Sequence, residues 1–296
     1  MIWQKNLIKL YFYFCEDRLI QGHLQNLRMS NNGNLNFTDE EILTIYLFGI
    51  IQNMSKVKHI YQYTAQHLKD WFPQLPSYQA FNARLNRLES CFSMLINGLI
   101  KQNLLAKDIH EKVLDSLPII VAGNSRSSSA KVAKRLCSKG YCSSKGIYYY
   151  GIKLHALGIV QAEHIPMPQQ VWITGAAEND LTAARPILEH IENSKIYADK
   201  IYADAALNEE LQTQQNSTIV TPIKNKKGQK TKDAAADIYS TLVSKVRQPI
   251  ESFFNWINEK TNIQNAQRVR SEQGLLVHIW SKFAAALLLL TRFFNP

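Results

Sequence analysis

Residues 113–121 read VLDSLPIIV, a short apolar run that is interrupted by one carboxylate. A run of this length that is rich in Val and Ile predicts a buried strand, and we expect it to bend or end near Pro118, since a central strand needs every amide. Asp115 within such a strand is costly unless its carboxylate is hydrogen-bonded or binds a metal. Asp115 is therefore a candidate site residue, and an Asp satisfied by a turn near the strand end is the alternative.

The elements that follow this strand alternate in a recognisable order. The pattern predicts strands at 147–160 and 170–174, a helix at 178–193, a strand at 195–199, a helix at 205–215, a strand at 218–224 and helices from 234 onward. Three strands followed by alternating helix and strand (β-β-β-α-β-α-β-α) is the order of the ribonuclease-H-like fold, an α/β fold with a mixed sheet. The order by itself is weak support, because many α/β proteins alternate.

The residues that precede the strand read as helices. Thr38 and Glu41 have the spacing of a capping box, and Ser77 is placed to cap a later helix. That later helix carries a core-facing stripe of apolar residues at spacings of three and four: Phe81, Leu85, Leu88, Phe92, Leu95 and Leu99. We therefore expect a helical N-terminal domain at 1–107, followed by a second domain at 108–296 that holds the predicted strands.

Composition excludes several classes of protein. The chain has 34 Lys and Arg against 24 Asp and Glu, a net charge of +10, with 46% apolar residues, which excludes a disordered chain. The most apolar stretch, 283–290, falls short of the roughly 20 residues that a bilayer requires. With no signal peptide in view, the expectation is a cytoplasmic protein with no membrane partner.

The positive charge is clustered. Residues 121–155 hold seven basic residues and no acidic ones, and residues 222–270 hold ten basic and four acidic ones. Clustered Lys and Arg suit phosphate neutralisation, so a nucleic acid is the expected partner, while two solvated faces are the alternative. The candidate DNA-contacting residues are Arg84, Arg87, Arg126, Lys131, Lys153, Lys226, Lys227, Lys230, Arg247 and Lys260.

Two further carboxylates could join Asp115. In KIYADKIYAD (195–204), Asp199 follows a short strand, whereas Asp204 is placed to cap the next helix; we assign chemistry to Asp199 and structure to Asp204. In VRQPIESFF (246–254), Arg247 and Glu251 lie four apart on one helix face, with a surface ion pair as the alternative. Pro249 between them would kink that helix or start a new one.

Three carboxylates from two strands and a helix suit a divalent metal. Mg²⁺ prefers hard oxygen ligands, with Mn²⁺ as the alternative ion. Two such ions can activate a water or a 3′-hydroxyl and stabilise the leaving oxygen of a phosphodiester. Asp115, Asp199 and Glu251 are thus the expected metal-binding and catalytic set, holding two ions.

Several stretches resemble the DDE transposases of bacterial insertion sequences, most closely the group named for insertion sequence nine-eight-two. They are FTDEEILTIYLFGI (37–50), WFPQLPSYQAFNARLNRL (71–88), VLDSLPI (113–119), YYYGIKLHALG (148–158), IYADKIYAD (196–204) and RQPIESFFNWINEKTNIQ (247–264). The resemblance implies a ribonuclease-H-like domain and a Mg²⁺-dependent triad of Asp115, Asp199 and Glu251. It also implies DNA cleavage and strand transfer on terminal inverted repeats and target DNA, by a homodimer when DNA is bound. The domain at 108–296 is then the catalytic domain. The N-terminal domain is expected to recognise the DNA ends, since Arg84 and Arg87 lie three apart beside its apolar stripe.

The chain departs from that family at two places. Many related transposases have a Tyr three residues before the Arg and a Lys seven after the Glu, where this chain has Ser244 and Asn258. Tyr239 and Lys260 are the nearest substitutes, and their roles stay open. Two other readings also stay open: an inactive DNA-binding derivative of a transposase, and a metal-dependent nuclease that does not join strands.

Overall fold

The structure is a computed structural model of the chain, and it describes residues 2–28, 35–104, 110–143, 145–161, 164–224, 233–291 and 293–294. By compactness the chain divides into a helical unit, Met1–Asn103 with Ile257–Pro296, and a sheet unit, Leu104–Trp256. This division places 257–296 with the N-terminal helices, whereas the sequence grouped them with the catalytic domain. The functional division at 107 stays a prediction.

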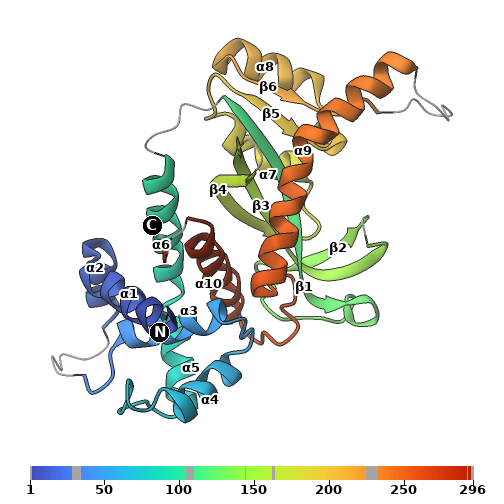
Figure 1. The fold of residues 1–296 in the computed structure, drawn as a ribbon. Helices are drawn as coiled ribbons and strands as arrows, with labels where there is room; N and C mark the ends of the chain where they lie inside the picture. Colours follow the sequence, from blue (N-terminus) through green and yellow to red (C-terminus); the bar gives the residue numbers. More distant parts are fainter. Residues whose placement is uncertain are drawn as a thin grey trace. The chain divides into compact units, whose positions relative to one another are not determined.

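The helical unit is built around one buried helix. It contains α1 (Ile2–Glu16), α2 (Arg18–Leu27), α3 (Asp39–Ile51), α4 (Val57–His67), α5 (Tyr78–Arg87), most of α6 (Glu89–Leu104), and α10 (Glu272–Leu290) (Figure 1). Every residue from Ile42 to Ile50 is buried, and α3 contacts α1, α4, α5 and α10. The capping box of Thr38 and Glu41 at the start of α3 is confirmed.

The predicted apolar stripe is buried, but it belongs to two helices. Phe81 and Leu85 lie on α5, and Phe92, Leu95 and Leu99 lie on α6. The break comes at Leu88, whose amide donates to the Leu85 carbonyl three residues back, which tightens the last turn of α5. Ser77 caps α5 as expected, accepting a hydrogen bond from the amide of Ala80.

Helix α10 is long and apolar enough to cross a membrane by length and composition alone. Most of the described α10 side chains are buried inside the helical unit, Leu275, Ile279 and Phe283 completely. Helix α10 also contacts α3 and α5. In this structure it is therefore packed as a core helix.

The sheet unit holds a six-stranded, curled mixed sheet. Its elements are β1 (Glu111–Gly123), β2 (Ser138–Cys142), β3 (Ile147–Gln161), β4 (His164–Gly175), α7 (Asp180–Leu188), β5 (Lys195–Ala198), α8 (Ala205–Gln215), β6 (Thr218–Val220) and α9 (Ala234–Thr261), the last of which runs on into the helical unit. The strand order is β2-β3-β1-β5-β6, with β4 also paired to β3. β3 runs antiparallel to β1, β2 and β4, while β5 runs parallel to β1 and β6.

Strand β1 runs through Pro118, contrary to the expectation that it would bend or end there. β5 pairs only with Glu111–Leu114 of β1, so at Pro118 the strand has a ladder partner on the β3 side alone. A missing amide is tolerated at such a one-sided position. The register shift falls later, between Ile120 and Ala122. Strand β2, which pairs with the first part of β3, was not predicted.

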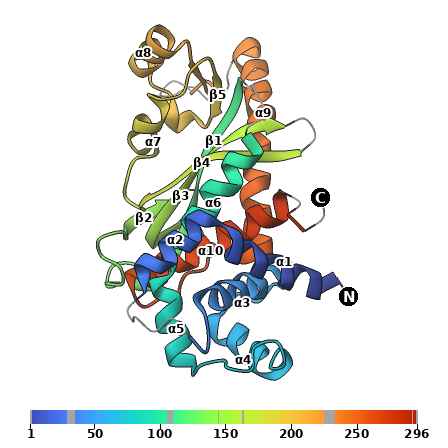
Figure 2. The same ribbon diagram turned by 90° about the vertical axis from the view of Figure 1, so that its left-hand side faces the viewer.

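The two faces of the sheet carry different helices (Figure 2). Leu114 of β1 and Leu157 of β3 pack in one core cluster with residues of α7 and α8. Gly158, the next residue of β3, faces the other way: a Cβ there would lie 3.8 Å from Cδ1 of Ile250 on α9. Because neighbouring strand residues point to opposite faces, α7 and α8 cover one face of the sheet and α9 covers the other.

Candidate active site

Asp115 and Asp199 come together through strand register. Leu114 of β1 pairs with Ala198 of β5 in the parallel ladder, and each of the two aspartates is the next residue of its strand or strand end. Leu114 and Ala198 both face α7 and α8, so alternation places both aspartates on the α9 side. The Asp115 Oδ1 accepts a hydrogen bond of 2.8 Å from the Ser116 amide, and the Asp199 Oδ1 accepts one of 2.7 Å from the Lys200 amide.

Helix α9 brings the third carboxylate. Nη1 of Arg247 donates to Oδ2 of Asp115 at 3.0 Å, and Nη2 of the same guanidinium pairs with Oε1 of Glu251 four residues on. The Arg247 side chain is 15% exposed and that of Glu251 is 50% exposed. Arg247 therefore links a half-exposed carboxylate on the helix to a largely buried one on the sheet, which is more than a surface ion pair.

Pro249 neither breaks nor begins the helix. Helix α9 is continuous from Ala234 to Thr261 with this proline inside it. The predicted spacing of Arg247 and Glu251 on one helix face is confirmed by their ion pair.

The carboxylates act on one another electrostatically. Burial raises the pKa of Asp115 to about 6; the Ser116 amide and Arg247 oppose this, while the negative charges of Asp199 and Glu251 add to it. The acidic side chains thus concentrate negative charge at one place on the α9 face. Such a place favours a bound cation.

Arg247 supplies the cation in this structure. Within the described ranges, no three His, Cys, Asp or Glu side chains stand close enough together to hold a metal ion. The oxygens of Asp115, Asp199 and Glu251 are nevertheless the hard donors that Mg²⁺ prefers. The donor set fits a divalent ion, provided that the Arg247 guanidinium yields its place between Asp115 and Glu251.

A cavity of about 490 Å³ adjoins Arg247 and Glu251 along α9. The α9 residues that line it are polar, and they include Ser240, Ser244 and Gln248. The cavity therefore offers hydrogen-bonding groups beside the carboxylates.

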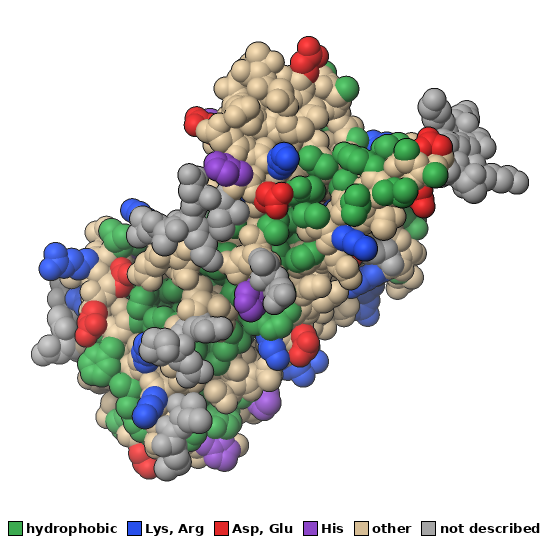
Figure 3. All heavy atoms as spheres, turned by 45° about the horizontal axis from the view of Figure 1, so that its top comes forward, with side chains coloured by type: hydrophobic (Ala, Val, Ile, Leu, Met, Phe, Trp, Pro, Cys, Tyr) green, Lys and Arg blue, Asp and Glu red, His purple; other side chains and the backbone are tan. Residues whose placement is uncertain are grey.

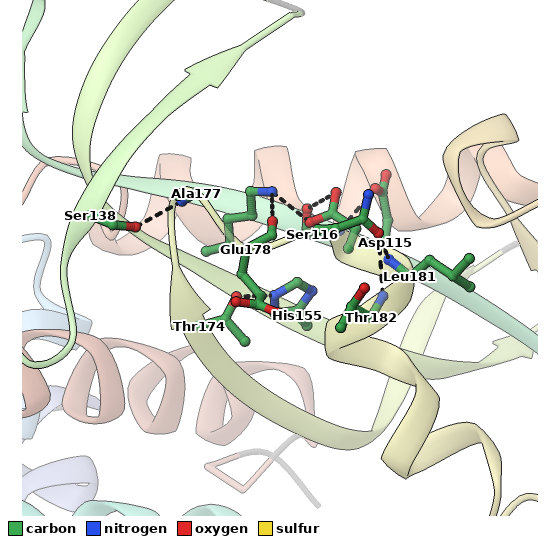
Figure 4. Close-up of polar contacts among 12 residues, drawn as sticks. Asp115, Ser116, Ser138, His155, Thr174, Ala177, Glu178, Leu181 and Thr182 are labelled. Atoms are coloured by element: carbon green, nitrogen blue, oxygen red, sulfur yellow. Dashed lines mark hydrogen bonds and ion pairs between the residues drawn. The ribbon is translucent and has the colours of Figure 1, made fainter.

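Asp180 is a site feature that the sequence did not reveal. It lies in the first turn of α7 and contacts Ser116, whose side chain points to the opposite face of the sheet from that of its neighbour Asp115. Its carboxylate accepts hydrogen bonds from Nζ of Lys153 at 2.8 Å and from Oγ of Ser116 at 3.2 Å (Figure 4). Since Ser116 follows Asp115 directly, this network holds the strand in place from behind. Only an acidic residue at a helix start was visible in the sequence.

Two buried side chains, His155 and Tyr202, lie on the same side of the sheet as α7. Burial lowers the pKa of His155 to about 4, so its ring is neutral at pH 7; it stacks on Trp172, and its Nε2 contacts Oγ1 of Thr174 at 2.7 Å. Burial raises the pKa of Tyr202 well above its usual value, and the nearby carboxylates Asp180, Asp115 and Asp199 add to the effect. Both groups keep one protonation state near neutral pH.

A family model described as a transposase DDE domain matches residues 106–272, more than half of the chain. The chain belongs to the DDE transposases. A comparison with curated protein sequences found no match to this chain. The matched range contains the whole sheet, the three acidic residues and Arg247.

The transposase uses two of its expected DNA-contacting cations internally. Arg84 donates to Oδ1 of Asp39 through Nε and Nη2 at 3.0 and 2.5 Å, and to the carbonyl of Phe37. Lys153 is held by Asp180 and by the carbonyl of Glu178. Both side chains are mostly buried in these contacts.

The other predicted basic residues are variously placed. Arg87 lies at the exposed end of α5, and Arg126 and Lys131 are exposed between β1 and β2. Lys260 pairs with Glu259 at 3.3 Å near the end of α9. Lys226, Lys227 and Lys230 lie outside the described residues. A role for these residues in DNA binding stays a prediction.

The two side chains that depart from the family pattern, Ser244 and Asn258, form hydrogen bonds within α9 and at its C-terminal end. Oγ of Ser244 donates to the Ser240 carbonyl, and Oδ1 of Asn258 accepts from the Gln264 amide. Tyr239 lies with Ile238 and Leu242 on an exposed apolar stretch of α9, where hydrophobic side chains gather (Figure 3).

Asp204 caps α8 by accepting from the Leu207 amide at 3.0 Å, so its predicted capping role is confirmed.

Proposed function

We propose that this DDE transposase binds the ends of an insertion sequence and catalyses Mg²⁺-dependent DNA cleavage and strand transfer. The observation that supports it most is the gathering of Asp115, Asp199, Arg247 and Glu251 on the α9 face of the sheet. Mn²⁺ is the alternative ion, and two ions are proposed. We further propose that the chain belongs to the nine-eight-two group.

In this proposal the three carboxylates hold the metal, which supplies Lewis-acid stabilisation of charge at the scissile phosphate. Asp115 is held by the Ser116 amide and presents its other oxygen toward α9. Arg247, displaced from both carboxylates, would remain on α9 beside the site, where its guanidinium would bind a DNA phosphate. The polar side chains along α9 would orient the DNA strand.

The sheet supports a ribonuclease-H-like fold for the catalytic domain. The strands β4, β3 and β1 are antiparallel neighbours, and β5 and β6 continue the sheet in parallel on the far side of β1. We propose a domain division at 107, with end recognition by the N-terminal helices. Terminal inverted repeats and target DNA are the proposed partners, with a homodimer on DNA and a cytoplasmic location.

The test is incubation of the purified protein with DNA carrying the terminal repeats of its element, with and without Mg²⁺. Nicks at the element ends and joined products on target DNA are expected. Nicks without joined products would indicate a nuclease that does not join strands. Binding without nicks would indicate an inactive derivative, and neither binding nor nicks would refute the proposal.

A further inference from the structure

The helical unit contains a cavity of its own, of about 640 Å³. It is lined by the start of α4, by one side of α5, and by the segment 262–278 that joins α9 to α10 and includes the first turns of α10. All of these residues belong to the helical unit, so the cavity is separate from the carboxylate site. Its volume is that of an ordinary ligand site.

The cavity is cationic. Lys56, Lys58, Arg268 and Arg270 line it, and no Asp or Glu does. Among the described residues, none of these four cations forms an ion pair with a carboxylate. Nη1 of Arg270 donates instead to the carbonyls of Gln267 and Val269, at 2.8 and 2.9 Å. Those bonds orient the guanidinium and leave its charge uncompensated, so the cavity attracts a polyanion.

Side-chain amides are interleaved with these cations. Gln62, Asn82, Asn86 and Asn265 line the same cavity. Nδ2 of Asn86 donates to the Asn82 carbonyl at 2.9 Å, which fixes the direction of that amide. Cations suit phosphates, while Asn and Gln side chains suit the edges of bases, so the combination matches nucleic acid better than a small anion.

Two side chains of α10, His278 and the buried Lys282, hold the cationic segment in place. Nε2 of His278 contacts the Ile263 carbonyl at 2.8 Å, and Nζ of Lys282 donates to the Asn262 carbonyl at 2.9 Å. The first turn of α10 also approaches α5 closely, because a Cβ at Gly274 would lie 3.6 Å from Oδ1 of Asn86. The wall that carries Arg268 and Arg270 is thus anchored to the helical unit at both of its ends.

We infer that this cavity is a second DNA-binding site, in which the four cations hold phosphates of one DNA strand and the amides bind its sugars and base edges. The inference rests on the proposed function, which makes DNA the substrate. On α5, Arg84 was the expected DNA contact, but its guanidinium is engaged with Asp39. The proposed DNA contacts of this helix are instead Asn82 and Asn86, which line the cavity.

The test measures DNA binding by the full chain in EDTA, so that no cleavage occurs. The probe is a fluorescein-labelled random duplex of about 30 base pairs, and the readout is anisotropy over a range of salt. The variant Lys56→Gln/Lys58→Gln/Arg268→Gln/Arg270→Gln should weaken binding at least about tenfold and flatten the log–log salt slope by about 3–4, since each of the four phosphate contacts contributes about 0.9.

A matched control separates a site from general charge. Lys5, Arg18, Lys69 and Lys101 are exposed residues of the helical unit away from the cavity, and their replacement by Gln removes the same charge. We expect this control to weaken binding by less than about threefold. Equal weakening in both quadruple variants would overturn the inference, as would unchanged binding by the cavity variant.

A neutral variant tests the amides. Asn82→Ala/Asn265→Ala should weaken binding at least about threefold with an unchanged salt slope, because neutral contacts release no counterions. Should the quadruple variant fail to fold, the single changes Lys58→Glu and Arg268→Glu at exposed positions must each weaken binding, or the inference fails.

The two proposals fail in different ways. A wild-type chain that binds no DNA overturns both of them. A chain that binds DNA through the cavity but makes no Mg²⁺-dependent nicks overturns only the proposed function.

Discussion

Arg247 reaches from the middle of α9 to the central strand and binds Asp115, with 3.0 Å between Nη1 and Oδ2. The same guanidinium pairs with Glu251, so one cation joins two carboxylates that come from different elements. A divalent ion bound by those carboxylates would have to displace it. Arg247 and the metal therefore compete for the same negative charge.

Arg247→Ala should lower the free energy of unfolding by about 1–3 kcal/mol without metal, because it removes the cation partner of a largely buried carboxylate. Urea denaturation in EDTA at pH 8 measures this. Addition of Mg²⁺ should then stabilise the variant more than the wild type, since no guanidinium has to leave.

The control for that change is Arg185→Ala. Arg185 pairs with Glu210 at 3.4 Å, and both side chains are about 40% exposed (43% and 39%). Such a pair contributes at most about 1 kcal/mol. If Arg247→Ala is no more destabilising than Arg185→Ala, the ion pair between Arg247 and Asp115 contributes no more to stability than an exposed pair does.

Asp199→Ala and Asp204→Ala separate chemistry from capping within one short segment. Asp199→Ala should reduce Mg²⁺-dependent nicking at least about 1,000-fold, since a lost metal ligand removes transition-state charge stabilisation worth several kcal/mol. Asp204→Ala should leave nicking within about threefold of the wild type and cost about 0.5–2 kcal/mol of stability, because it removes the cap of α8. The reverse pattern would exchange the two assignments.

Local signals in the sequence predicted much of the fold, because each rested on a short-range interaction. The capping box at Thr38 and the helix Ala205–Gln215 were predicted from residues a few positions apart, and both are confirmed. The break at Leu88 was missed because the apolar spacing continues across it, and spacing does not report a single tightened turn. Strand β2 was missed because SKGYC has little apolar pattern.

The candidate site was predictable as a set of acidic residues and not as a geometry. The partner of Asp115 is Arg247, and its identity depends on how α9 crosses the sheet, which no local pattern encodes. Lys153 looked like a DNA contact because of its charge, yet Asp180 holds it from another element. Contacts between residues distant in sequence decide which cations are available to a ligand.

Gly49→Ala should destabilise the helical unit. A Cβ at Gly49 on α3 would lie 2.6 Å from both Cγ1 and Cγ2 of Ile60 on α4, so the two helices could not keep their spacing. Overpacking of this kind costs about 1–3 kcal/mol. Urea denaturation followed by circular dichroism measures the loss.

The matched variant is Gly22→Ala on α2, where a Cβ would meet nothing within 4 Å. In a helix interior this change should stabilise by about 0.5–1 kcal/mol. Opposite signs for the two glycines are expected. A neutral Gly49→Ala would mean that α3 and α4 pack less closely than described.

Lys282 makes the stability of the helical unit depend on pH. It is 1% exposed, and burial lowers its pKa from 10.5 to about 7, while Nζ donates to the Asn262 carbonyl. Between pH 7 and 10.5 the unfolded chain binds more protons at this residue than the folded chain, so the free energy of unfolding should rise with pH in that window.

The substitution Lys282→Met removes this dependence. From pH 7 to 10, the stability of the wild type relative to the variant should rise by about 3–4 kcal/mol, because each unit of pKa difference is worth about 1.4 kcal/mol. Urea denaturation at several pH values measures the difference, and Lys101→Met, at an exposed position, should leave the pH dependence unchanged. Parallel curves for the wild type and Lys282→Met would mean that the buried ammonium keeps an ordinary pKa.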